Sequence, residues 1–410
     1  MLMNKKVCLI TPGHIATDPR LVKEAIALSK NGYDVHIIFS QYMQYLLVED
    51  FKILNKQSWT YDCINWSNQN LLSKTIRLFS GVIQKLAIKF PSFSLSYEII
   101  LNRHFYWQYK RATKCKADIY IAHNLGALSV AYKVAKKYNK VVGFDAEDFH
   151  RNETTDDFNN RDFIIKSTIE DKYLPYVNYI SAASPLIAKE YERLYKIKVT
   201  SILNVFPNTF LKNEVKGNKT KTLNLFWFSQ TIGRGRGLEM VISSLGIVKD
   251  LDISIHLLGE LSEGERKYLN ELFFESGFPI AKVCYYPSIP SDEVIPFASN
   301  FDIGLATEIS VPYNRNICLT NKLFTYIQAG NAVVYSDTLA QKGFMNQYHE
   351  IGLMYSNDKI HSLSNLISFY YFNREILEIH KKNAQQLGQK KLNWEIEQLN
   401  FMDLIKSIHF

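Results

Sequence analysis

The 410-residue sequence is poor in the residues that mark stapled or low-complexity proteins. It has 18 glycines and 11 prolines, too few for a collagen-like repeat or a Gly/Pro-rich disordered chain. Its five cysteines are widely scattered and include no Cys-x-x-Cys pair, which argues against a zinc site or a disulfide framework and fits reduced thiols in a cytoplasm. No window approaches 18 uncharged apolar residues, and the first apolar run is too short for a signal peptide, so neither a transmembrane helix nor a leader is expected.

The abundant residues are those of a folded core. Hydrophobic residues make up 47% and charged residues 21%, which is ordinary for a globular protein and excludes a disordered chain. A length of roughly 150 residues per domain predicts two or three domains. The 48 basic and 40 acidic residues give a formal net charge of +8. That charge permits an anionic ligand, a nucleic acid or an acidic membrane surface, and it selects none of them.

Apolar runs of strand length alternate with helical patterns in two series. In the first series, residues 6–11 predict a strand, 18–31 a helix and 35–39 the next strand, which is a βαβ start and therefore a parallel sheet. Further strands are predicted at 118–122, 141–145, 178–182, 199–203, 223–229, 253–258, 283–286, 302–306 and 332–335. The predicted fold class is α/β, with two Rossmann-like domains.

A polar stretch without apolar periodicity, residues 208–222, predicts a linker between the two domains. The predicted domains are 1–207 and 223–385, followed by a helical tail whose last part, 386–410, is expected to pack back toward the first domain. Ligands of doubly wound folds lie beyond the carboxyl ends of the strands. The site is therefore expected in a cleft between two facing sheets.

A basic, glycine-rich turn follows the first strand of the second domain. Its backbone N–H groups and the start of the helix near Leu238 would favour an anion. Arg234 and Arg236 would donate charge-assisted hydrogen bonds to phosphate. The turn lacks the Gly-Lys-Ser/Thr ending of a Walker loop, and the alternative is an exposed basic turn without a ligand. The glycines of this turn are Gly233, Gly235 and Gly237.

A polar loop leads into a second short helix, predicted to begin at Thr320 or Asn321 and to end at Gly330. Lys322 lies near the start of this helix, where the helix dipole disfavours a cation. That placement is tolerable if Lys322 faces a bound anion. The alternative is an ordinary solvated lysine.

In their order along the chain, these segments resemble the nucleotide-sugar glycosyltransferases of the GT-B fold, in particular the family-4 type common in bacterial polysaccharide synthesis. The Arg236-Gly237 turn and the stretch 321–334 carry the resemblance in the second domain. In the first domain, residues 18–20, 118–123 and 144–148 look like the family's first helix and its two cleft-facing strand ends. The likeness spans nearly the whole chain.

The resemblance implies a sugar transfer from a nucleotide-sugar donor to a glycan or lipid-linked glycan acceptor, with no cofactor and no metal. The first domain would lie on the acceptor side and the second would bind the donor, with Arg236 on its diphosphate. His123 would face the transferred sugar or the acceptor, although it could instead cap the helix that follows it. The catalytic candidates are Asp18, His123 and Glu147. The donor-binding candidates are Gly13, Gly233, Arg234, Arg236, Gly237, Glu260, Glu308, Asn321, Lys322 and Thr325.

One departure from the family concerns two glutamates that are often eight residues apart. Ile317 and Thr325 stand at those positions, and Glu260 or Glu308 would have to replace the nucleoside contacts. This departure leaves open whether the transfer retains or inverts the configuration at the anomeric carbon of the sugar. It also keeps two alternatives: a catalytically silent homologue that serves as a binding partner in a glycan-assembly complex, and a nucleotide-sugar 2-epimerase.

Residues 71–90 form a basic amphipathic segment. Lys74, Arg77, Lys85 and Lys89 interleave with large apolar residues, as in helices that lie on anionic membranes. The alternative is a helix whose apolar face packs on the sheet. A cytoplasmic protein in peripheral contact with the inner face of the membrane would suit a lipid-linked acceptor. No nucleic-acid reading motif is present, so no nucleic-acid partner is expected.

Overall fold

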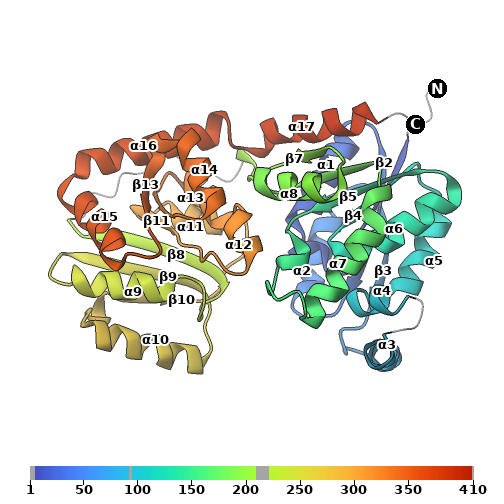
Figure 1. Cartoon of the computed structure of the whole chain (residues 1–410), viewed down its shortest axis with the longest axis horizontal. Coiled ribbons are helices and arrows are strands. Elements are labelled where there is room, and N and C mark those ends of the chain that lie inside the picture. The colour runs from blue at the N-terminus through green and yellow to red at the C-terminus, as the bar shows by residue number, and fades with distance from the viewer. Residues whose placement is uncertain (1–4, 92–94, 209–220, 409–410) are drawn as a thin grey trace. The chain divides into compact units, whose positions relative to one another are not determined.

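Two units, each with its own parallel sheet, make up the chain in the computed structural model (Figure 1). The structure describes residues 5–91, 95–208 and 221–408. Unit 1 comprises Met1–Ile202 and Gln398–Phe410, and unit 2 comprises Leu203–Glu397. Most of the predicted linker, 208–222, lies outside the described residues.

Unit 1 is built on a seven-stranded parallel sheet in the order β3-β2-β1-β4-β5-β6-β7. Its central strands are buried on both faces, which is why they read as continuous apolar runs in the sequence. The strands are β1 Lys6–Ile10, β2 Asp34–Gln41, β3 Thr60–Asn65, β4 Ile119–His123, β5 Val141–Ala146, β6 Tyr179–Ala182 and β7 Val199–Ser201. The helices are α1 Pro19–Lys30, α2 Leu46–Leu54, α3 Leu71–Lys89, α4 Ser96–Leu101, α5 Phe105–Cys115, α6 Leu125–Tyr138, α7 Arg161–Tyr173 and α8 Pro185–Tyr195.

Unit 2 has a six-stranded parallel sheet in the order β10-β9-β8-β11-β12-β13. The strands are β8 Leu223–Thr231, β9 Ile253–Glu260, β10 Val283–Tyr286, β11 Ile303–Ala306, β12 Ala332–Ser336 and β13 Gly352–Tyr355. The helices are α9 Leu238–Ile247, α10 Glu263–Ser276, α11 Val294–Ala298, α12 Tyr313–Ile317, α13 Asn321–Ala329, α14 Leu339–Gln347, α15 Ile360–Phe372 and α16 Arg374–Lys390. The helical tail is confirmed: α16 is followed by α17 Trp394–Ser407, which begins in unit 2 and ends in unit 1.

The strand order of each sheet reverses beside its first strand, between β1 and β4 in unit 1 and between β8 and β11 in unit 2. In doubly wound sheets such a reversal opens a crevice beyond the carboxyl ends of the two strands. Gly13, His123, the turn 233–237 and Glu308 lie at or just after the ends of these four strands. Glu147 follows the neighbouring strand β5, and Glu260 ends the neighbouring strand β9. The fold thus places part of each half of the predicted set at the switch point of its own sheet.

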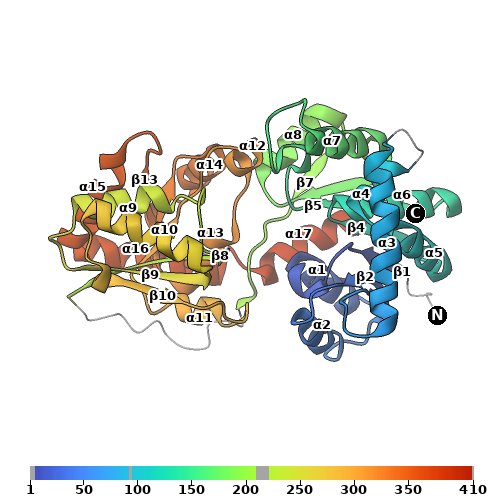
Figure 2. The same ribbon diagram turned by 90° about the horizontal axis from the view of Figure 1, so that it is seen from below.

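Helix α3 confirms the predicted helix, but its apolar residues do not pack on the sheet. Its buried residues are small, namely Ser73, Ser80 and Ala87, whereas its large apolar residues are exposed except for the half-buried Ile76. Figure 2 shows α3 along the outside of unit 1, beside α4. Within the described residues, no helix is both long enough and apolar enough to cross a membrane.

Candidate functional site

The glycine-rich turn of unit 2 connects β8 to α9, and Gly237 is the N-cap of that helix. Gly237 has a φ of 83°, and a Cβ there would lie 3.0 Å from the side chain of Thr307. Both facts require glycine at this position. The backbone N–H of Gly235 donates to Glu239 Oε1 over 2.8 Å, so the first turn of α9 holds the turn in place.

Two arginines at this turn, Arg236 and Arg315, form no ion pair with a carboxylate of the described residues. Arg236 is half-buried, and its Nη1 donates to Ser229 Oγ over 2.8 Å. Arg315, in α12, donates from Nη1 to the carbonyl oxygen of Gly235 over 2.7 Å. In the described part of the chain no carboxylate forms an ion pair with either guanidinium. Uncompensated positive charge at a helix N-terminus is suited to a phosphate.

Arg234 has a different environment. Its Nε lies 3.4 Å from Glu265 Oε1, and its guanidinium carbon lies 4.1 Å from the ring centre of Tyr268. Its side chain is 64% exposed. Glu265 therefore offsets the charge that the sequence analysis assigned to a donor phosphate.

A groove of about 580 Å³ brings four of the predicted donor-binding residues together: Gly233, Arg234, Arg236 and Glu260. Glu260 is the exposed last residue of β9, and its carbonyl oxygen accepts the N–H of Ile232 over 2.8 Å. The groove is thus formed by the loops that follow β8 and β9. It lies at the edge of the sheet where ligands of such folds bind.

The remaining unit 2 candidates gather between β11 and α13. Lys322 Nζ lies 2.5 Å from Glu308 Oε1, and both side chains are largely buried. The hydroxyl of Thr320 also donates to Glu308 Oε1, over 3.0 Å, instead of capping α13. Glu308 therefore compensates the cation that the helix dipole disfavours. Thr325 is 1% exposed.

The predicted helix boundaries here are confirmed, since α13 has Thr320 as its N-cap and ends at Gly330 with a φ of 74°. Asn321 accepts a hydrogen bond at Oδ1 from Asn204 Nδ2 over 2.9 Å. Ile317 is buried at the end of α12. The roles of Asn321, Lys322, Thr325 and Glu308 toward a donor stay predictions.

A buried ion pair organises the site region of unit 1. Arg20 donates from Nε and Nη2 to the two carboxylate oxygens of Asp145, over 2.7 and 2.5 Å, and from Nη1 to the carbonyl oxygen of Ile202. Arg20 is 2% exposed and Asp145 is fully buried. Ser181 donates to Asp145 Oδ1 over 2.8 Å. This bidentate geometry is the strong form of an arginine–carboxylate pair.

His123, the last residue of β4, lies among three carboxylates. Its Nε2 is 3.3 Å from Glu24 Oε2, and its Nδ1 is 3.5 Å from Asp145 Oδ2 and 3.9 Å from Asp18 Oδ1. Burial alone would lower the pKa of the ring, but Glu24 and Asp145 raise it well above the usual value. The neighbouring carboxylates therefore favour the protonated form of the ring.

His123 is fully buried in the structure, so its predicted contact with a sugar stays a prediction. The alternative, that His123 caps the next helix, is wrong. Asn124 is the N-cap of α6, and its side chain accepts the N–H of Gly126.

Glu147 and Asp18 complete the catalytic candidates of unit 1. Glu147 follows β5 directly and is half-buried. Burial, followed by the charges of Asp18 and Asp145, raises the pKa of Glu147 well above its usual value. Asp18 is the N-cap of α1, where its Oδ1 accepts the N–H of Leu21 over 3.0 Å. A carboxyl group with a raised pKa, such as that of Glu147, suits a general base.

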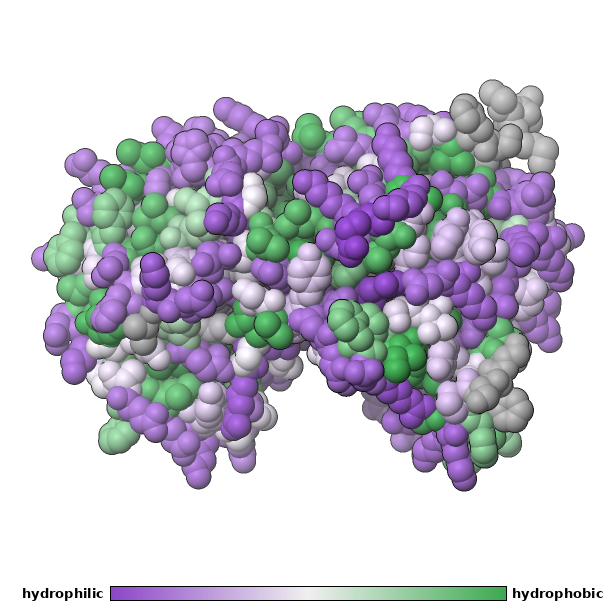
Figure 3. Space-filling view, in the orientation of Figure 1, coloured by the Kyte–Doolittle hydropathy of each residue, from purple (hydrophilic) through white to green (hydrophobic). Residues whose placement is uncertain are grey.

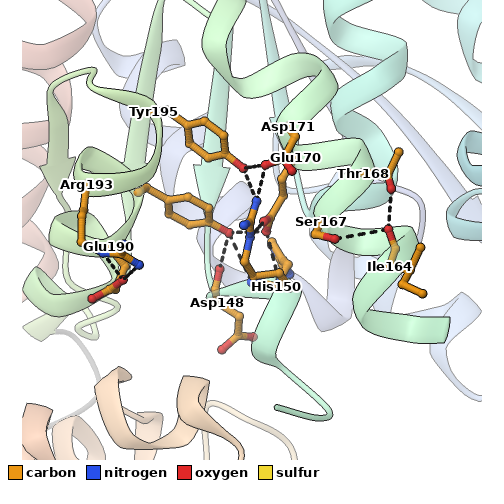
Figure 4. Close-up of polar contacts among 12 residues, drawn as sticks. Asp148, His150, Ile164, Ser167, Thr168, Glu170, Asp171, Glu190, Arg193 and Tyr195 are labelled. Atoms are coloured by element: carbon orange, nitrogen blue, oxygen red, sulfur yellow. Dashed lines mark hydrogen bonds and ion pairs between the residues drawn. The ribbon is translucent and has the colours of Figure 1, made fainter. Parts of the chain in front are cut away.

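A second buried network holds the chain that follows Glu147 (Figure 4). Arg151 Nε and the hydroxyl of Tyr191 donate to the two oxygens of Glu170, over 2.6 and 2.7 Å. Tyr191 also accepts the backbone N–H of His150 over 3.2 Å. In Figure 4 the carboxylate of Asp148 points away from this network. The network fixes the backbone after β5 and so the position of Glu147.

Comparison with known proteins gives structural matches only. No protein-family model and no curated protein matches the sequence. The structure of Anabaena HepE in complex with UDP and glucose matches with a TM-score of 0.68 at 13% identity, over 99% of this chain and 100% of that one. Sucrose-phosphate synthase from Thermosynechococcus elongatus and a glycosyltransferase from Rickettsia africae both match with a TM-score of 0.71 over 98% of each chain, at 14% and 12% identity.

The chain has the GT-B fold. Each of these three matches covers nearly all of this chain and nearly all of the matched chain. The fold that the sequence resemblance implied is therefore confirmed, including the two Rossmann-like units and the helical tail.

In this GT-B chain, the loop after β1 is held by a histidine that the sequence analysis did not assign. His14 is fully buried; its Nδ1 lies 2.6 Å from Asp50 Oδ2, and its Nε2 accepts the N–H groups of Tyr42 and Met43. The ring proton must then be on Nδ1. Gly13 precedes this anchored residue, and its predicted place near donor phosphate stays a prediction.

Three charged residues of the GT-B units were not assigned a role from the sequence: Arg20, Glu24 and Arg315. The signal for Arg20 was indirect. Asp145 ends a buried strand, and a buried carboxylate requires a cation. The position of that cation is not readable from the sequence, because it is 125 residues away along the chain. For Arg315, in a polar loop, the sequence carries no signal.

The pair of Arg20 and Asp145 predicts how stability depends on pH. Burial would raise the pKa of Asp145, but Arg20 and His123 hold it well below its usual range. A depressed pKa in the fold gives stabilisation that is complete above the unfolded pKa of about 3.9 and is lost as the pH falls toward the folded value. The difference in free energy of unfolding between the wild type and Asp145→Asn should therefore be constant above about pH 5 and shrink below about pH 4.

Urea unfolding at several pH values measures this difference. Glu190→Gln serves as the control, because Glu190 pairs with Arg193 at the surface over 2.8 Å. Its effect should stay small at every pH. A difference for Asp145→Asn that grows on acidification would contradict the assignment.

Proposed function

We propose that the protein is a glycosyltransferase that moves a sugar from a nucleotide-sugar to a glycan acceptor in cell-surface polysaccharide synthesis. The observation that carries this proposal is the half-buried guanidinium of Arg236, without an acidic partner in the described residues, at the glycine-rich start of α9. The turn opens into the groove beside β8 and β9. This arrangement has the chemistry of a diphosphate site.

The donor is proposed to carry uridine diphosphate. The matched HepE has been solved with UDP and with UDP-glucose. This chain matches that protein over 98% of its length, which supports testing uridine nucleotides first.

The chemistry follows from where charge develops. When the sugar–phosphate bond breaks, negative charge grows on the leaving diphosphate, and Arg236, Arg315 and the start of α9 would stabilise it without a metal. Glu147 would accept the proton of the acceptor hydroxyl. Three other carboxylates, those of Asp18, Glu24 and Asp145, lie in the same region of unit 1 as Glu147. Their charges would be balanced by Arg20 and His123. Analysis of the product would show whether the configuration at the anomeric carbon is retained or inverted.

The acceptor is proposed to be a glycan that is linked to a lipid, and the transfer to take place at the inner face of the cytoplasmic membrane. Nucleotide-sugars and lipid-linked acceptors meet at that face. Radiolabelled sugar recovered in a lipid extract, rather than in water-soluble glycan, would support this acceptor class.

The first experiment is a thermal-shift screen with UDP, GDP, CDP, CMP, ADP and dTDP, with and without Mg²⁺. A nucleotide at about one hundred times its dissociation constant adds about 2.7 kcal/mol of stability, which shifts the midpoint measurably. We expect UDP to give the largest shift. Arg236→Ala should weaken its affinity about 10- to 100-fold, because a hydrogen bond to a charged group is lost.

Arg266→Ala is the matched control, since Arg266 is exposed on α10 and stacks on Tyr285 at 4.9 Å, outside the groove. Its affinity for UDP should equal that of the wild type. Normal affinity in Arg236→Ala would remove the donor-site assignment. No shift with any nucleotide would favour a silent binding partner, and turnover of the donor without an acceptor would favour the epimerase.

A further inference from the structure

Helix α3 turns its small residues toward unit 1. Seven residues are close to two helical turns, so residues spaced by seven share one side. Arg103 Nε donates to the hydroxyl of Ser80 over 3.1 Å, and Gln84 Nε2 donates to the carbonyl oxygen of Ile100 in α4 over 2.9 Å. These bonds attach the small side to the body of the unit. The buried residues of α3 are Ser73, Ser80 and Ala87.

A stripe of large apolar residues in contact with solvent lies about 100° around α3 from its small side. Leu72, Phe79 and Leu86 repeat every seven residues and so line up along the helix. In Figure 3 hydrophobic side chains appear among hydrophilic ones at the lower right, where Figure 1 draws α3. An exposed apolar patch of this kind marks an interaction site. The exposed fractions are 70% for Leu72, 64% for Phe79, 49% for Val82, 46% for Ile83 and 52% for Leu86.

Basic residues border the stripe. Lys74, Arg77, Lys85 and Lys89 are all exposed, and α3 contains no aspartate or glutamate. Their spacings of three, eight and four residues place them on one side of the helix. An apolar stripe bordered by lysine and arginine, without acidic residues, is typical of a helix that lies in the interface of an anionic bilayer.

Two arginines where α3 meets the rest of unit 1, away from the stripe, share one tryptophan. The guanidinium carbons of Arg103 and Arg77 lie 4.2 and 5.7 Å from the ring centre of Trp66. Arg103 is oriented by its bond to Ser80 and by a second bond from Nη2 to the carbonyl oxygen of Arg77, over 2.7 Å. Over the described ranges, neither guanidinium has a carboxylate within ion-pair distance. Burial and the charge of Arg103 lower the pKa of the adjacent His104 to about 4. The cluster thus adds positive charge to unit 1 beside α3 that no carboxylate of the described residues compensates.

We infer that α3 docks unit 1 on an anionic phospholipid surface, with the stripe among the acyl chains and with the exposed Lys85 and Lys89 on lipid phosphates. A second copy of this chain is a poorer occupant, because it would bring the same basic residues to the contact. The inference does not depend on the proposed glycosyl transfer. It assigns a partner surface rather than a reaction.

Co-sedimentation of the full chain with vesicles tests this inference. The wild type should bind vesicles of phosphatidylglycerol and phosphatidylcholine and bind pure phosphatidylcholine at least about tenfold more weakly. Phe79→Ser with Ile83→Ser should weaken binding to the anionic vesicles at least about tenfold, since two apolar side chains leave the bilayer. Lys85→Gln should weaken it about fivefold, and more at low than at high salt.

Matched controls keep the result specific. Lys189→Gln removes one exposed charge on α8, and Phe274→Ser removes an apolar side chain that is 86% exposed on α10. Both should bind as the wild type does, and all variants should bind UDP equally. Equal binding to neutral vesicles, or unchanged binding in the α3 variants, would overturn the inference. So would a dimer, seen in sedimentation, that the Phe79/Ile83 variant abolishes while vesicles stay unbound.

Discussion

Arg20→Leu should lower the free energy of unfolding by about 3–5 kcal/mol. The guanidinium forms two hydrogen bonds with Asp145, and its Nη2 lies 4.0 Å from Glu24. Removing it leaves a fully buried carboxylate without its cation, which costs far more than the intact pair contributes. Urea unfolding of the full chain measures the loss.

The surface pair of Arg193 and Glu190 supplies the control for this variant. The Arg193 side chain is 65% exposed, and Arg193→Leu should change stability by no more than about 0.5 kcal/mol. Adding Asp145→Leu to Arg20→Leu should recover part of the loss, because the unpaired charge is then gone. A loss below about 1 kcal/mol for Arg20→Leu alone would mean that solvent reaches Asp145.

Glu147→Gln should lower kcat for sugar transfer about 10²- to 10⁴-fold and leave the dissociation constant for UDP unchanged. Glutamine keeps the size of the side chain but cannot accept the acceptor's proton. The pKa of Glu147 is raised by burial and by Asp18 and Asp145, so only the ionised fraction acts as a base. In the wild type, kcat/KM should therefore rise with pH through a value above the usual glutamate pKa of about 4.3. The rate of UDP release in the presence of acceptor measures kcat of the variant and kcat/KM of the wild type at each pH.

In Glu147→Gln that pH-dependent rise should disappear, which a merely structural role would not produce. Glu49→Gln is the control, since Glu49 is 48% exposed and pairs with Lys52 at the surface. Its kcat and pH profile should match the wild type. A normal rate in Glu147→Gln would transfer the role of base to Asp18.

The two series of strands and helices could be predicted from the sequence because central strands of a parallel sheet are buried on both faces and therefore form continuous apolar runs. Val7, Cys8, Leu9 and Ile10 are all fully buried, and they form a plain apolar run. Two edge strands were not predicted, β3 and β13. An edge strand has one open side, so Thr60–Asn65 mixes polar and apolar residues and does not read as a run.

The candidate site was readable only in part. Glycines and arginines near a strand end indicated the turn of Arg236, since that chemistry is local in sequence. Whether the charge of an arginine is available to a ligand depends on whether a carboxylate from another segment pairs with it in the fold. Arg234 pairs with Glu265 of α10, and Lys322 pairs with Glu308. Arg236 and Arg315 pair with no carboxylate in the part of the chain that the structure describes.

The sequence by itself determined the two α/β units, the basic glycine-rich turn and the amphipathic pattern of residues 71–90, because each rests on residues close together along the chain. Only the tertiary structure decided which charges are compensated, that the small side of α3 packs inward, and that His123 is buried among Glu24, Asp145 and Asp18. These outcomes depend on contacts between distant segments, and no local pattern encodes the partner that a buried charge will meet.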